Sequence, residues 1–454
     1  MKPNIILLII DSFRADKFHH DTKTSITPNI DNLIQTGTYF SQTISSADAT
    51  LLSWSSIFTG LNPFKTGIRS SRFNKLNQNI TTIFDLLKQE NYEFYSFTPT
   101  FSETIGLFPK FKNNNSIYDF TETLDTGLGS KILSLLSSNE SKSPWFLNLH
   151  LLDLHYPLLV PTNFNSDKFG FSKYEKIVSV IDSWLGKFMK HIDLENTIII
   201  ITSDHGASIK KIKKDDNIID FEDNGEKEIQ KKKITNKIPK FLKPIKDKFY
   251  FSLESKKQNK KMEKLSQFIL SDYEKRSLLS ANFSIDHFLF DEKIRVPLLF
   301  VGKGIPKNHK FSKQVGLVDI FPSLCYLLQL DVNYQNLDGR NLFPLKSESI
   351  FEELPIYIES NPLIDIESND VVGIRTSNFK YFRDVNSSSK RVHLFDLQND
   401  PFEENNISSE NQEKTSTMES ILKNLLDNSD KEITENDELS SDDIENELRK
   451  MGYV

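Results

Sequence analysis

Four side chains that can bind a metal ion stand where predicted elements begin or end. Asp11 follows the apolar run at residues 4–10, Thr50 precedes a helical pattern, and Asp204 and His205 follow the apolar run at residues 196–202. Two carboxylates, an imidazole and a hydroxyl can enclose one divalent cation, and such an oxygen-rich set favours Mg²⁺, Mn²⁺ or Ca²⁺ over zinc. The sequence therefore predicts a metal site formed by Asp11, Thr50, Asp204 and His205.

Thr50 has the chemistry of a nucleophile in this arrangement. A bound cation would make its hydroxyl easier to deprotonate and would orient it, and the helix that it opens favours an anion at its N-terminus. Each residue alone also has a plainer interpretation. Asp11 could pair with Arg14, Thr50 could cap its helix, and residues 204–206 could be an ordinary turn. The combination favours the metal site.

A second polar group lies in the sequence LHLLDLHYP, at the end of a predicted strand. It contains His150, Asp153 and His155, which could contact a bound anion or protonate a leaving group. A buried histidine with satisfied hydrogen bonds is the alternative for each. We expect His155 to be functional, and His150 less so.

Alternating strands and helices must position these residues. Apolar or β-branched runs predict strands at residues 4–10, 92–98, 145–151, 196–202 and 296–302, and helical patterns lie between them, among them 28–36 and 51–58. This alternation is typical of an α/β fold with a doubly wound, mainly parallel central sheet. Ligands bind such sheets at the carboxyl ends of the strands, which is where the candidate residues lie.

The composition indicates a folded body that carries polar insertions. The 454 residues are 37% hydrophobic and 26% charged, with a net charge of −7. Cys325 is the one cysteine, which excludes an internal disulfide and favours a reducing compartment. The apolar run near the N-terminus is too short for a signal peptide, and no stretch is apolar enough to span a membrane. We expect a soluble, cytoplasmic protein that does not bind nucleic acid, and its oligomeric state stays open.

The charge pattern divides the chain. A catalytic domain is predicted over residues 1–335, interrupted at 207–284 by a lysine-rich insertion with a short helix near 262–280. The insertion could contact an anionic lipid or polymer, or be a solvated loop. A smaller α+β subdomain is expected over 336–410, followed by an acidic tail over 411–454 that could contain a helix at 442–451.

Many blocks of the chain resemble the sulfatase-like enzymes of the alkaline phosphatase superfamily. The blocks are PNIILLIIDSFRAD, TPNIDNLIQTGTYFSQTIS, TLLSWSSIFTGLNPFKTGI, ITSDHG, FDEKIRVPLLFVGKGI, VGLVDIFPSLCYLLQL, DGRNLFPL and HLFDLQNDPFEENNI. The resemblance implies an alkaline phosphatase-like fold and a metal held by the four residues named above. It also places Thr50 at the position of the family's nucleophile.

The resemblance departs from the classical sulfatases at that position. Those enzymes have a cysteine or serine there, oxidised to formylglycine, and threonine cannot be converted in this way. Leu52 and Trp54 stand where their motif has proline and arginine, and Cys325 lies elsewhere. Other branches of the family, among them phosphodiesterases, phosphoglycerol transferases and phosphoethanolamine transferases, use an unmodified threonine that becomes phosphorylated. This favours a phosphoester-cleaving or phosphoryl-transferring enzyme with a covalent Thr50 intermediate.

Three further features define the prediction. Ser12 replaces the second aspartate of the classical pair, which favours a single cation, and the family's lysine–histidine block has no counterpart in FTPTFSETIGL. His287 resembles a family histidine that approaches the substrate, so His155 and His287 are expected to bind the anion or assist the leaving group. The substrate would be an anionic ester such as a lipid or glycan head group. The alternatives are a sulfate-ester hydrolase without formylglycine and a non-catalytic binding protein with this fold.

Overall fold

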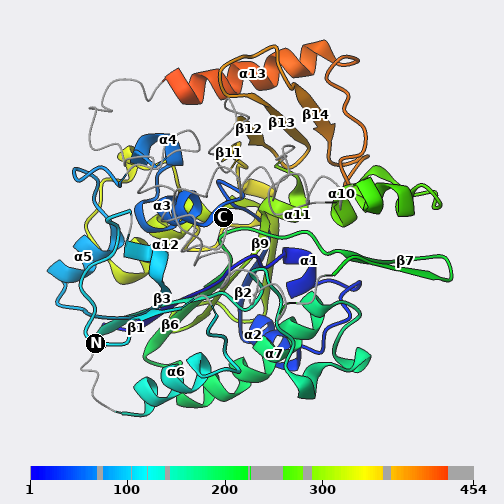
Figure 1. Ribbon diagram of the computed structural model, residues 1–454. Helices are drawn as coiled ribbons and strands as arrows, with labels where there is room; N and C mark the ends of the chain where they lie inside the picture. Colours follow the sequence, from blue (N-terminus) through cyan, green and yellow to red (C-terminus); the bar gives the residue numbers. More distant parts are fainter. Residues whose placement is uncertain are drawn as a thin grey trace, which may run out of the picture.

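An eight-stranded sheet forms the centre of the computed structural model (Figure 1). The structure describes residues 2–68, 75–103, 105–119, 121–138, 144–222, 225, 259–279, 289–360 and 370–427. The strand order is β10-β2-β9-β6-β1-β5-β3-β4. The strands are β1 (Asn4–Ile10), β2 (Gly37–Ile44), β3 (Glu93–Pro99), β4 (Ile117–Tyr118), β5 (Trp145–Leu151), β6 (Thr197–Thr202), β9 (Arg295–Gly302) and β10 (His309–Gly316).

The sheet is mainly parallel, as predicted. Within it β9 runs antiparallel to both of its neighbours, β2 and β6, while the other pairs are parallel. β1 is a central strand, and its side chains from Ile5 to Ile10 are buried because helices cover both faces of the sheet. The predicted strands at 4–10, 92–98, 145–151, 196–202 and 296–302 correspond to β1, β3, β5, β6 and β9.

Helices form a layer on each side of the sheet (Figure 1). One layer contains α2 (Pro28–Thr36), α6 (Leu128–Ser137) and α7 (Lys173–Phe188), and the other contains α3 (Thr50–Thr59), α5 (Ile83–Gln89) and α12 (Ile320–Leu328). Short helices α1 (Ala15–Phe18) and α4 (Pro63–Thr66) lie in the connections. The predicted helix at 28–36 is confirmed, and the one at 51–58 is α3. It ends at Gly60, whose φ of 70° is a left-handed conformation that suits glycine.

A second, antiparallel sheet forms the C-terminal subdomain. Its strand order is β11 (Ile356–Glu359), β12 (Val371–Arg375), β13 (Phe379–Asp384) and β14 (His393–Asp396). Helix α13 (Gln412–Asp427) covers one face, and its buried Met418 and Leu422 pack in one cluster with Tyr381 of β13.

The predicted boundary between subdomain and acidic tail at residue 410 was wrong. Helix α13 begins at Gln412 and packs on the subdomain, because its apolar residues repeat at helical spacing and bury one stripe. The predicted helix at 442–451 lies outside the described residues.

The predicted insertion at 207–284 is described in part. Residues after β6 form a hairpin of β7 (Lys211–Lys214) and β8 (Asn217–Asp220), and α10 (Asp272–Leu279) lies within the predicted helical stretch. A small apolar cluster of Ile219, Leu265, Leu270 and Leu278 joins hairpin and helix. In the part of the chain that the structure describes, no helix is long and apolar enough to cross a bilayer.

Replacing Leu422 by alanine tests whether α13 belongs to the subdomain. Leu422 is fully buried against the second sheet, so its truncation leaves a cavity and should lower the free energy of unfolding by about 2–5 kcal/mol. Urea unfolding measures this change, and Asn424→Ala on the exposed side of α13 is the control. Equal stability of the two variants would show that α13 does not pack on the sheet.

Candidate metal centre

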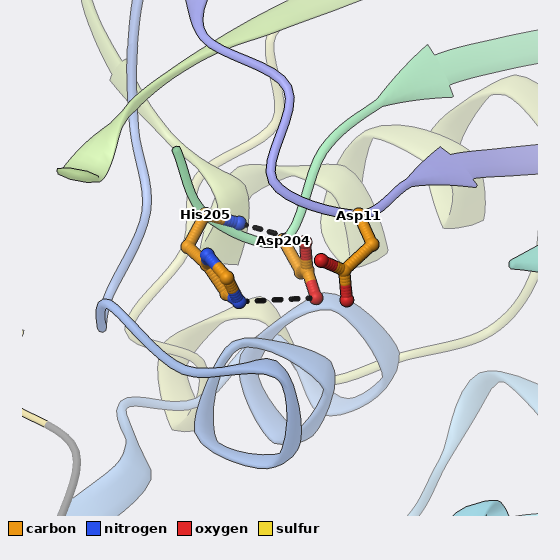
Figure 2. Close-up of side chains that lie close together, drawn as sticks. All are labelled: Asp11, Asp204 and His205. Carbon is orange, nitrogen blue, oxygen red and sulfur yellow. Dashed lines mark hydrogen bonds and ion pairs between the residues drawn. The ribbon is translucent and has the colours of Figure 1, made fainter. Parts of the chain in front are cut away.

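Adjacent strands deliver the two candidate carboxylates. Asp11 follows β1, and Asp204 follows β6, which pairs with β1 so that Ile9 lies opposite Thr202. Both carboxylates therefore leave the sheet at the same level, and both are fully buried. One ligand atom from each of Asp11, Asp204 and His205 lies within 4.8 Å of the others (Figure 2). The strand register thus creates a group that can hold a cation.

Ser12 joins the two carboxylates. Its hydroxyl donates to Asp11 Oδ1 at 2.6 Å, and its backbone N–H donates to Asp204 Oδ1 at 3.3 Å. Its φ of 62° is left-handed, which costs a non-glycine residue about 1–2 kcal/mol. Tyr174 holds the turn by donating its hydroxyl to the Ser12 carbonyl at 2.7 Å. The turn at Ser12 therefore aims hydrogen-bond donors at both acids.

Asp204 has one oxygen that is available for a cation. Its Oδ1 accepts the backbone N–H groups of Ser12 and His205, the latter at 2.8 Å, whereas the buried Oδ2 has no hydrogen-bond partner. An unpaired buried carboxylate oxygen is costly, because burial removes its water without a replacement. A divalent cation at this position would supply the missing partner.

The tautomer of His205 also suits a metal ligand. Its Nδ1 donates to the Gly206 carbonyl at 2.9 Å, which leaves the lone pair on Nε2, 3.8 Å from Asp204 Oδ2. Burial by itself would lower the pKa of His205, but the negative charges of Asp204 and Asp11 raise it above its ordinary value. The field that favours a proton on this ring would equally attract a metal cation.

Thr50 completes the predicted set. It is the first residue of α3, and its hydroxyl lies 3.3 Å from Asp11 Oδ2 and 3.4 Å from His205 Nε2. The residue before it, Ala49, occupies the capping position, so the Thr50 hydroxyl faces the acids instead of capping the helix. The structure therefore brings Asp11, Thr50, Asp204 and His205 together, and these residues fit one divalent cation.

His150 lies closer to the centre than the sequence suggested. Its Nε2 is 3.3 Å from Asp11 Oδ2, and its Nδ1 accepts the indole N–H of Trp54 at 3.1 Å. Burial alone would raise the pKa of the Asp11 carboxyl, but the hydrogen bond from His150 and the fields of His155 and His205 hold it well below its usual range. Asp11 is thus kept as a carboxylate. Trp54 was not among the predicted site residues, because in the sequence it stands out only as the residue at the arginine position of the family motif.

Of the two other predicted histidines, the structure describes His155. His155 is partly exposed beyond β5, near enough for its field to act on Asp11. His287 lies outside the described residues. Lys293, which sequence reasoning missed, precedes β9, and its backbone carbonyl accepts from Gly206 N at 2.6 Å. Burial lowers the pKa of the Lys293 amine below its ordinary value, although the negative charge of the nearby Asp48 partly offsets this shift.

Asp153 is not part of the group that could hold the cation. Its Oδ1 accepts the backbone N–H of Leu124 at 3.0 Å, and its buried Oδ2 has no hydrogen-bond partner. Burial raises the pKa of Asp153 from 3.8 to about 7. Asp153 therefore anchors the segment before α6, and the geometry gives it no place among the ligands.

Two family models match the chain. The model described as Sulfatase matches residues 3–330, and the model described as N-sulphoglucosamine sulphohydrolase, C-terminal, matches residues 283–432. Together they cover both sheets. The first model alone covers more than half of the chain and includes all four candidate ligands.

Curated relatives match over shorter stretches. Arylsulfatase K of Canis lupus familiaris is 31% identical over 144 residues, which are 30% of this chain and 27% of the relative. An uncharacterized protein of Haemophilus influenzae is 26% identical over 214 residues, which are 46% of this chain and 33% of the relative. The chain thus spans about a quarter to a third of the length of these relatives.

Solved structures share the fold across nearly the whole chain. A phosphonate monoester hydrolase of Agrobacterium radiobacter has a TM-score of 0.62 at 16% identity, covering 94% of this chain and 95% of its own. A protein in complex with its substrate D-glucosamine-2-N,6-O-disulfate has a TM-score of 0.60 at 15% identity, covering 95% of this chain and 100% of its own. At these identities the likeness shows the fold alone.

Cation binding can be measured without a substrate. Mn²⁺ at about 100 times its Kd should stabilise the fold by about 2.7 kcal/mol and raise the thermal midpoint by several degrees. Asp204→Asn keeps the acceptor for Ser12 but removes the charge of the unpaired oxygen, so this shift should disappear. Asp31→Asn, which removes a partly exposed carboxylate paired with Lys23, is the control and should keep the full shift. A full shift in Asp204→Asn would exclude this cation site.

Asp153 predicts a pH dependence of stability. Because its pKa rises from 3.8 unfolded to about 7 folded, the folded protein holds a proton that the unfolded chain releases. Its contribution is fully present below about pH 4 and is lost as the pH rises through about 7. Asp153→Asn should therefore gain stability relative to the wild type across pH 4–7 in urea unfolding. Parallel curves for the two proteins would contradict the raised pKa.

Proposed function

The chain belongs to the sulfatase family, and on this premise we propose that it cleaves or transfers a phosphoester group through a covalent intermediate on Thr50. The observation that carries the proposal is the place of the Thr50 hydroxyl. It opens a ten-residue helix and lies 3.3 Å from Asp11 Oδ2 and 3.4 Å from His205 Nε2. A nucleophile, a cation site and a helix N-terminus thus meet at one point.

The residue type at position 50 favours an unmodified nucleophile. Threonine cannot be oxidised to formylglycine, and Leu52 and Trp54 replace the proline and arginine of the classical motif. Cys325 is buried in α12, and burial raises the pKa of its thiol to about 12, so it is a poor nucleophile. We therefore assign the nucleophile to Thr50, whose hydroxyl lies at the N-terminus of α3.

The reaction would proceed in two displacements. The Thr50 oxygen attacks phosphorus, the bond from phosphorus to the leaving oxygen breaks, and a phospho-threonine forms. Water or an acceptor alcohol then attacks phosphorus and releases Thr50. A divalent cation bound by Asp11, Asp204 and His205 would neutralise charge on the transferred group. In-line transfer mainly requires positioning and charge neutralisation, which a rigid buried site supplies.

Positive groups around the centre have roles in this scheme. His155 would donate a proton to the leaving oxygen, and the Thr50 hydroxyl would lose its own proton to water as the cation lowers its pKa. In the second displacement His155 would take a proton from the attacking water or alcohol, and the released Thr50 oxygen would be protonated by solvent. His287 is proposed to bind the anion with His155. Lys293, held beside Gly206 and close to Asp48, would provide positive charge where the family's lysine–histidine block is missing.

A sulfate-ester hydrolase is the second candidate. Its support is the 31% identity to arylsulfatase K over 144 residues. Against it stands the chemistry of Thr50, since an unmodified threonine would form a sulfated enzyme that is hard to hydrolyse. A binding protein that kept the fold and lost turnover is the third possibility, favoured by the replacement of the second aspartate by Ser12.

The substrate class follows from the same reasoning. We propose an anionic ester, such as a lipid or glycan head group, because the site combines a cation position with nearby lysine and histidine. A neighbour of similar fold is a complex with a sulfated glucosamine, which agrees with a glycan head group. A cytoplasmic location is proposed from the single cysteine, Cys325.

Turnover of paired aryl substrates tests the proposal. Aryl phosphodiester, phosphomonoester and sulfate are compared with Mn²⁺, Mg²⁺ or Ca²⁺, for wild type, Thr50→Ala and Thr50→Ser. We expect metal-dependent phosphoester cleavage that falls by about 10⁴-fold or more in Thr50→Ala, because the nucleophile is lost. Thr50→Ser keeps the hydroxyl and should retain measurable turnover. Mass spectrometry of the quenched enzyme should find a phosphoryl group on the peptide that contains Thr50.

The other outcomes separate the alternatives. Sulfate cleavage that survives Thr50→Ala would overturn the nucleophile assignment. Sulfate cleavage that needs Thr50, without phosphoester cleavage, would support the second candidate. Cation binding without turnover of any ester would favour the binding protein.

A further inference from the structure

Trp54 and His150 form a buried pair beside the metal centre. Trp54 lies one helical turn after Thr50 in α3, and His150 is in β5, next to β1. The indole N–H donates to His150 Nδ1 at 3.1 Å, and the two rings meet edge to face, with centroids 4.8 Å apart. Both side chains are fully buried. Packing and hydrogen bond together hold the imidazole in one orientation.

The indole determines which tautomer His150 adopts. An indole nitrogen can only donate, so the Nδ1 atom that faces it must carry a lone pair. The neutral ring then has its proton on Nε2, which lies 3.3 Å from Asp11 Oδ2. A proton on Nδ1 would place two N–H groups against each other. His150 is thereby a hydrogen-bond donor to Asp11.

The same nitrogen stands where a metal ligand could stand. His150 Nε2 is 3.3 Å from Asp11 Oδ2 and 4.0 Å from Asp204 Oδ2, close to the atoms that would bind the cation. The donor tautomer withholds its lone pair from a metal. Two carboxylates with His205 alone favour a hard cation, whereas a second imidazole would suit zinc.

We propose that Trp54 sets the cation selectivity of the centre by holding His150 as a hydrogen-bond donor to Asp11 and so keeping it from becoming a ligand. Trp54 is then a positioning residue that acts through His150. The proposal rests on the metal site within the proposed function, but not on the ester that the enzyme cleaves. It gives a role to a residue that stands where the classical motif has arginine.

Trp54→Phe tests the proposal on the metal-free protein. Phenylalanine keeps most of the ring packing but lacks the N–H, so the Nδ1 tautomer becomes accessible and Nε2 can bind a metal. Titration calorimetry should then show that the ratio of Zn²⁺ to Mn²⁺ affinity rises by about tenfold or more. Trp184→Phe is the matched control, because this buried indole donates to the Gly129 carbonyl and contacts none of the candidate ligands. It should leave the ratio unchanged.

A second variant shows whether the change acts through His150. In Trp54→Phe combined with His150→Gln, the amide can still donate to Asp11 but offers no imidazole lone pair. The gain in relative Zn²⁺ affinity should therefore disappear. A gain that persists in the double variant, or an unchanged ratio in a folded Trp54→Phe, would overturn the proposal.

Nitrogen NMR of the wild type provides a test that needs no substitution. The ¹⁵N shifts of His150 should be those of a ring with the proton on Nε2 and an unprotonated Nδ1. A proton on Nδ1 would refute the proposal even if Trp54→Phe failed to fold. Neither measurement uses a substrate. Failure of phosphoester turnover with the expected NMR and zinc results would therefore count against the proposed function alone.

Discussion

The closeness of two buried carboxylates, Asp11 and Asp204, is the constraint on which the rest of the structure depends. One oxygen of each lies within 4.8 Å of the other. Two negative charges at such a distance repel by roughly 3–4 kcal/mol in a partly polar interior, and each has lost its water. The surroundings offset this cost with N–H and O–H groups from Ser12, His150 and the backbone of His205. The Asp204 oxygen that has no hydrogen-bond partner is where a cation would complete the arrangement.

The C-terminal subdomain supports this centre from outside. Asp291, just before β9, pairs with Arg375 at 2.8 Å and with Lys380 at 2.6 Å, and both bases belong to the second sheet. This fixes α11 (Asp291–Ile294), whose Lys293 carbonyl binds the backbone beside His205. The second sheet also meets the segment before Thr50, since Glu359 N donates to the Ser46 carbonyl at 2.9 Å. The loop that carries His205 and the segment before Thr50 are thus both held by contacts that involve the second sheet.

Two departures from the classical sulfatase motifs act on the same carboxylate. Ser12, in place of the second aspartate, donates to Asp11 Oδ1, and Trp54, in place of the arginine, orients His150 toward Asp11 Oδ2. Each replaces a charged residue of the motif by a neutral hydrogen-bonding one. The threonine at position 50 accompanies both changes. The three substitutions together describe a site with fewer charged side chains, in which a threonine hydroxyl opens α3.

The sequence by itself determined the main elements and which residues meet at the candidate metal centre. The hydrophobic periodicity and composition of the sequence predicted five strands of the central sheet and two of the helices that cover it. The strands could be predicted because buried parallel strands are continuous apolar runs. Residues at the ends of those runs meet at one edge of the sheet, and this sufficed to group Asp11, Thr50, Asp204 and His205. The tertiary structure alone decided the roles of His150 and Asp153, which lie three residues apart in one motif. The direction in which each side chain points, and the donor that faces it, depend on residues distant in the sequence, Trp54 for one and Leu124 for the other. For the same reason the residues of α13 were predicted to belong to an acidic tail. The narrow apolar stripe of this helix is buried only because it packs on the second sheet.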